Sequence, residues 1–98
     1  MSKNHHFNNG VFKKEIWVAN KTVFEKLIEI DVEFESGDEW SWVIANASGE
    51  LVKKIPGGGS GWHSLHLPSQ GLYGNFSIGF QSNTLTNKII KQGDVTFG

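Results

Sequence analysis

The sequence predicts an all-β fold, a single antiparallel β-sandwich of about seven or eight short strands, with a barrel as the alternative. Apolar and polar residues alternate in two long stretches, residues 24–34 and 72–80. Glycine, proline, asparagine and serine recur between such stretches, and no segment shows the 3.6-residue period of an amphipathic helix. Strands that alternate in this way bury one side and present the other, so two such layers pack face to face.

The composition fits one globular domain. The chain has 98 residues, of which 38% are hydrophobic and 12% aromatic, enough to form a core and outside the range of disordered chains. Residues 1–10 are polar and predict an N-terminal tail, which leaves residues 11–98 for the sandwich.

Charge and residue usage exclude several classes of protein. A net charge of −1, nine scattered lysines and no arginine argue against a nucleic-acid partner. The absence of cysteine excludes disulfides, thiolate metal sites and cysteine nucleophiles. We expect no membrane-spanning helix, because no apolar run reaches about 18 residues. Residues 1–10 lack the apolar centre of a signal peptide. The compartment stays open, with a secreted or cell-surface protein slightly favoured, and so does the oligomeric state.

The stretch Thr22–Ile44 sets the expected strand order. Acidic residues share one parity of residues 24–34 and apolar residues the other, and Gly37 marks a turn. A hairpin centred on Gly37 would place Phe34 opposite Trp40, and a three-residue connection would pair the strand at residues 11–19 with this hairpin. The expected core is Phe24, Ile28, Ile30, Val32, Phe34, Trp40, Ile44, Leu65, Phe76, Ile78 and Phe80.

Further strands are expected at residues 51–55, 62–67, 72–80, 88–91 and 95–97, with a turn at 92–94. The glycine-rich segment Gly57–Gly61 has three interpretations: a crossover between sheets, a ligand-contacting loop or an engineered linker. We expect a passive crossover, in which the glycines serve only chain flexibility.

The candidate catalytic and metal-binding patterns are weak, and we expect neither an enzyme nor a cofactor or metal site. Ser64 and His66 share a strand face, but no nucleophile motif surrounds a serine. His63 and His66 are three residues apart, which places them on opposite faces of a strand. The acidic row that begins at Glu29 is expected to be a solvated sheet face or a docking surface for a basic partner.

Exposed aromatic residues give the most specific functional hypothesis. Trp17, Trp62 and Tyr73 fall on the solvent parity of their strands, where the plainest interpretation is packing beneath loops or the N-terminal segment. If they are free, they suit a non-enzymatic module that binds a glycan or cell-envelope component, with His66 and Asn75 as polar partners. A secreted membrane-active or toxin-like protein, and a protein-binding or inhibitory module that uses the acidic strand face, are the alternatives.

Overall fold

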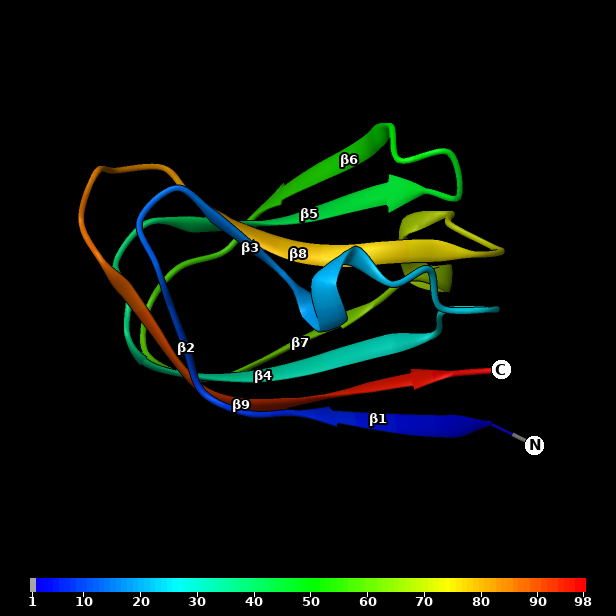
Figure 1. Cartoon of the computed structure of the whole chain (residues 1–98), viewed down its shortest axis with the longest axis horizontal. Helices are drawn as coiled ribbons and strands as arrows, with labels where there is room; N and C mark the ends of the chain where they lie inside the picture. Colours follow the sequence, from blue (N-terminus) through cyan, green and yellow to red (C-terminus); the bar gives the residue numbers. More distant parts are fainter. Residues whose placement is uncertain (1) are drawn as a thin grey trace.

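The computed structural model describes residues 2–98 and confirms the predicted fold: two antiparallel sheets pack face to face as a sandwich (Figure 1). No barrel closes, and the described residues contain no α-helix. The first sheet has the order β1-β9-β4-β7, with β2 also paired to β9, and the second has the order β3-β8-β5-β6. The strands are β1 (Lys3–Phe7), β2 (Gly10–Phe12), β3 (Glu15–Trp17), β4 (Glu29–Ser36), β5 (Trp40–Asn46), β6 (Leu51–Pro56), β7 (Gly61–His66), β8 (Phe76–Ser82) and β9 (Lys88–Phe97).

The core lies between the sheets and follows the predicted parity. Of the expected core residues, Phe24, Ile30, Val32, Phe34, Trp40, Ile44, Leu65, Ile78 and Phe80 are buried. Ile28 and Phe76 are half-buried. Leu27, which breaks the alternation, is buried too, because β4 begins only at Glu29 and the chain before it is not extended. Lys26 has a left-handed backbone (φ 48°), which turns Leu27 inward.

The predicted hairpin centred on Gly37 is wrong. Strand β4 belongs to the first sheet and β5 to the second, so Gly37 lies in a crossover between layers. Phe34 and Trp40 do meet, but their rings stack across the core with centroids 4.3 Å apart. A hairpin and a crossover bring residues of the same parity together, and alternation alone therefore does not distinguish them.

The predicted strand at residues 11–19 and its pairing with residue 24 onward are also wrong. Strand β2 pairs with β9 in the first sheet, whereas β3 pairs with β8 in the second. The chain changes sheets at Lys13–Lys14. Of the connections between consecutive strands, the one between β5 and β6 is a hairpin, and its residues 46–50, Asn-Ala-Ser-Gly-Glu, are typical of a turn.

Two polar segments form strand where the sequence suggests a tail and a turn. Residues 3–7, expected as part of the tail, form β1 and pair with β9. Residues 92–94 lie inside β9, which runs unbroken from Lys88 to Phe97. Gly93 is required there, because a Cβ at this position would lie 2.6 Å from the backbone oxygen of Asp31. Backbone pairing stabilises both segments despite their polar composition.

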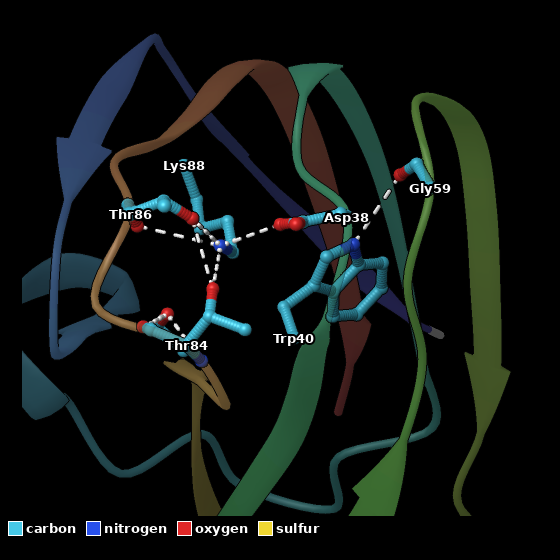
Figure 2. Close-up of polar contacts among 7 residues, drawn as sticks. Asp38, Trp40, Gly59, Thr84, Thr86 and Lys88 are labelled. Atoms are coloured by element: carbon cyan, nitrogen blue, oxygen red, sulfur yellow. Dashed lines mark hydrogen bonds and ion pairs between the residues drawn. The ribbon is translucent and has the colours of Figure 1, made fainter.

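A buried lysine at the start of β9 joins two loops at one end of the sandwich, the connection between β4 and β5 and the connection between β8 and β9 (Figure 2). Lys88 is fully buried, and its Nζ lies 2.7 Å from Asp38 Oδ1, 2.7 Å from Thr84 Oγ1 and 2.6 Å from Thr86 Oγ1. The hydrogen bond from Lys88 lowers the pKa of the Asp38 carboxyl, so this carboxylate is the counter-charge of the buried ammonium.

The glycine-rich segment is a crossover between sheets, as expected, but the structure does not support a merely flexible role. Gly57 packs against the Trp40 ring, and a Cβ there would lie 2.6 Å from the ring. Gly58 has a φ of 126° and approaches the backbone oxygen of Asp38. Trp40 Nε1 donates to the carbonyl of Gly59 at 3.3 Å (Figure 2). These close approaches demand glycine at residues 57 and 58.

Candidate functional site: an acidic sheet face with one exposed tryptophan

The outer face of the first sheet carries the only row of carboxylates that crosses neighbouring strands in residues 2–98. We call it the acidic face and define it by Glu29, Asp31 and Glu33 of β4 and Asp94 of β9. The alternating residues Ile30 and Val32 are fully buried, which directs the three β4 carboxylates outward. The strand register then places Asp94 directly opposite Asp31.

Trp62 flanks this face on the edge strand β7. It is 54% exposed and lies opposite Glu33 in the register of β7 and β4. Gln92 of β9 lies on the other side of Glu33, and its Nε2 donates to Glu33 Oε1 at 3.1 Å. Because neighbouring strands are about 4.8 Å apart, the indole, the carboxylate and the amide form one row roughly 10 Å across.

A second row crosses the face one pair further along the strands and is linked by hydrogen bonds. Ser64 of β7 donates to Asp31, and His6 Nδ1 lies 3.0 Å from Asp94 Oδ1. Asp31 and Asp94 carry like charges in directly opposed positions, which is unfavourable in a sheet unless neighbouring groups or a ligand offset the repulsion. The described residues supply two such groups, a hydroxyl and an imidazole.

The third row contains Glu29 and His66, which are paired in the register of β4 and β7. Desolvation raises the pKa of the Glu29 carboxyl, and the charge and hydrogen bond of Asp31 raise it further, while His66 acts in the opposite direction. His66 Nδ1 lies 2.8 Å from Ser69 Oγ, so its hydrogen bond in this structure is to Ser69 and not to Ser64.

The structure separates the residues that the sequence suggests as one ligand site. Trp62 and His66 share the acidic face, four residues apart on β7. Tyr73 is 75% exposed in the segment before β8, and the neighbouring Asn75 accepts a hydrogen bond from the backbone N–H of Lys26. Trp17 lies on the outer face of the other sheet, so the five residues do not form one platform.

Trp17 packs on the outer face of its own sheet. It is half-buried and lies over Gly79, where a Cβ would meet Trp17 Cε3 at 2.8 Å. Its Nε1 donates to Glu15 Oε2 at 2.7 Å, and Lys21 Nζ lies 4.6 Å from the ring centroid. This surface therefore does not present a free indole.

The sequence does not indicate that Asp94 of the acidic face and Gln92 beside Glu33 belong to the site, because residues 92–94 resemble a turn. The signal that indicates a strand is the spacing of the buried residues Ile90, Gly93 and Val95. A spacing of three within an otherwise alternating pattern is typical of a bulge, and the register indeed shifts after Glu33.

In comparisons with known proteins, no family model matches the chain and no curated protein matches it. Within residues 2–98, no helix has the length and apolar character that crossing a membrane requires. The face itself is therefore the basis for the functional proposal.

Proposed function

We propose that the acidic face binds a carbohydrate, with Trp62 as the stacking platform and Glu33 and Gln92 as hydrogen-bonding partners. The observation that carries the proposal is the row formed by these three residues, in which an exposed indole adjoins an acceptor and an amide. A sugar ring presents C–H bonds on its face and hydroxyl groups on its rim. An indole suits the face, and carboxylate and amide groups suit the rim.

The shape of the surface supports an extended ligand. Trp62 and the carboxylates lie on one side of three neighbouring strands, where a sheet offers an open surface instead of a closed pocket. Such a surface suits a polysaccharide chain that crosses the strands better than a small molecule that needs enclosure.

The test is a titration of the protein with neutral, acidic and amine-bearing polysaccharides, followed by tryptophan fluorescence and calorimetry. We expect binding that Trp62→Ala abolishes and Glu33→Gln weakens. Tyr73→Ala is the matched control, because Tyr73 is more exposed than Trp62 but lies away from the face. If no polysaccharide binds, or if Trp62→Ala binds as well as the unmodified protein, the proposal is wrong.

A basic protein partner is the second candidate. Four carboxylates share the face, whereas Lys91, 4.0 Å from Glu33, is the one lysine of the described residues within ion-pair distance of them. Association through such a face weakens as salt screens the charges. Combining Glu33→Gln with Asp94→Asn should abolish capture of a basic partner, whereas Trp62→Ala alone should leave most of it. A dependence on Trp62 without salt sensitivity would favour the carbohydrate.

A further inference from the structure

A cavity of about 140 Å³ opens between the two sheets, away from the acidic face. It lies where the edge of the first sheet is interrupted between β1 and β2, next to β3 and the turn η1 (Val18–Lys21) of the second sheet. Figure 1 shows η1 in front of the gap between the layers. Its apolar wall consists of Phe7, Ile16, Val18, Ala19, Phe80 and Ile90.

The chemistry of the wall restricts the ligand. Among residues 2–98, no charged side chain lines the cavity, and the polar contributions come from Asn8 and Trp17. The Nε1 group of Trp17 already donates a hydrogen bond to Glu15. The polar side chain that can still bond to a ligand is therefore the amide of Asn8, which is exposed. An ionised ligand would lose its hydration without gaining a counter-charge, which is unfavourable.

The volume sets the size of the ligand. An apolar protein cavity of about 150 Å³ remains dry and takes up benzene. The present cavity is of that size, and Phe7 and Phe80 contribute aromatic walls. An aromatic ring gains both burial and edge or face contacts with such walls.

An unusual backbone fixes one side of the cavity. Ala19, Asn20 and Lys21 all have left-handed conformations, with φ between 51° and 64°. Each such conformation costs a non-glycine residue energy and persists only where the surroundings impose it. Here Ser77 Oγ donates to the Lys21 carbonyl at 3.0 Å, and Lys21 Nζ donates to the Gly49 carbonyl at 3.2 Å. Ala19 is thereby held at the wall of the cavity.

From the cavity's size, its uncharged apolar lining and its fixed wall, we infer that this cavity is a second binding site, for an uncharged molecule built on one aromatic ring, with a small polar substituent directed towards Asn8. It is independent of the carbohydrate proposal, because none of its lining residues belongs to the acidic face.

A second hollow, of about 250 Å³, fits this ligand less well. It is more open, and Tyr73, one of its lining residues, is 75% exposed. Lys26 also lines it, so an apolar ring there would lie beside a charge and against solvent. This hollow serves as an internal reference for the experiment.

The test is a titration with benzene, phenol and benzoate, followed by amide and methyl NMR spectra of the protein. We expect benzene and phenol to shift the signals of Ile16, Val18 and Ile90 and to leave those of Leu27 and Leu72 unchanged. Phenol should also shift the Asn8 side-chain amide. Benzoate should bind at least about tenfold more weakly, because its charge loses hydration in the cavity.

A plugged variant gives the matched comparison. A Cβ at Gly10 would lie 2.9 Å from Ile16 Cδ1, so Gly10→Val places its methyl groups in the cavity. We expect this variant to lose benzene binding, whereas Val11→Thr, at a neighbouring residue that is 60% exposed, keeps it. Ile16→Ala enlarges the space and should admit naphthalene, which provides a second readout if Gly10→Val does not fold.

The inference is wrong if benzene shifts no cavity signal in the unmodified protein. It is also wrong if the shifts cluster around Leu27 and Tyr73, or if folded Gly10→Val binds benzene as the unmodified protein does. Preferential binding of benzoate would equally overturn it.

Discussion

The outer faces of the two sheets differ in how they meet solvent. On the second sheet, Val43 and Ala45 of β5 point outward yet are fully buried. The Trp17 ring lies over Gly79, the register partner of Val43, and Lys21 extends to the turn between β5 and β6. On the first sheet, the residues of the acidic face are carboxylates whose register neighbours include Gln92 and His66, and Trp62 beside them is 54% exposed.

This difference shows which exposed aromatic residue is informative. Trp17 and Trp62 have the same parity signal in the sequence, because each lies two residues from a polar residue, Glu15 or Ser64, on the same parity. Trp17 packs on the apolar outer face of the second sheet, and this packing accounts for a tryptophan at that position. Trp62 covers no comparable apolar surface on its own sheet, so it is the aromatic residue that indicates a binding surface.

The largest expected effect comes from placing a charge on the covered face. Val43→Glu buries a carboxylate at a position with 0% exposure, between the exposed Lys54 of β6 and Gly79 of β8. We expect the free energy of unfolding to fall by about 3–5 kcal/mol, because Lys54 at the surface offsets only part of the cost of desolvating the carboxylate. The reverse exchange on the acidic face, Glu33→Val, should change the free energy of unfolding by less than about 1 kcal/mol. Urea unfolding followed by circular dichroism measures both, and similar losses would contradict the comparison.

Removing the covering indole should have the next largest effect. Trp17→Ala uncovers the second sheet at Gly79 and should cost about 2–4 kcal/mol, slightly less than deletion of a fully buried tryptophan. Trp62→Ala should stay within about 0.5 kcal/mol, because Trp62 is more than half exposed. Thermal unfolding of the two variants in parallel is the measurement. Equal destabilisation would mean that both indoles are structural.

The contact beneath Trp17 should also be sensitive to a single methyl group. In Gly79→Ala the new Cβ would lie 2.6 Å from the backbone oxygen of Ile16 and 2.8 Å from the Trp17 ring. Since a backbone oxygen cannot move aside easily, we expect a loss of about 1–3 kcal/mol. Gly10→Ala, whose nearest neighbour is the flexible end of Ile16, is the control and should cost less.

The smallest effect concerns protonation of the acidic face. The pKa of Glu29 is raised in the folded protein, so the folded state holds this proton more tightly than the unfolded chain. The resulting stabilisation is fully present below the ordinary pKa of 4.5 and is lost as the pH rises through the folded pKa. Glu29→Gln should flatten this decline in urea unfolding between pH 4 and 7.

The opposite dependence is expected at Asp38, whose pKa is lowered in the folded protein. The unmodified protein should lose stability as the pH falls through the folded pKa of this carboxyl, and Asp38→Asn should remove that loss.

The sequence permits prediction of which residues face inward, but not of which strands pair. The alternation around Ile30 reflects a local property, the pleat of a strand, and it correctly identifies most of the core. Pairing depends on whether Gly37 closes a hairpin or a crossover, and this is decided by contacts such as that between Gly57 and Trp40, far apart in the sequence. A tripeptide at a turn carries no information about such contacts.

The candidate site could be predicted only in part for the same reason. Trp62 and His66 lie on one strand, so their shared face follows from parity. Gln92 and Asp94 join them only because β9 pairs with β4 across a bulge. Burial of Lys88 is likewise invisible in the sequence, because its counter-charge Asp38 lies 50 residues away, in the connection between β4 and β5.

The pairing of β1 with β9 has a mechanical consequence. Lys3 is the register partner of Phe97, so the two ends of the described chain leave the sandwich side by side (Figure 1). A pulling force applied between these ends loads the hydrogen bonds between β1 and β9 one after another, starting at Lys3 and Phe97, and does not load them all at once in shear. The edge strand then peels away under low force while the rest of the sandwich stays folded. If the chain is attached at both ends, it yields first at β1, and the cavity beside Phe7 is the first part of the interior that tension opens.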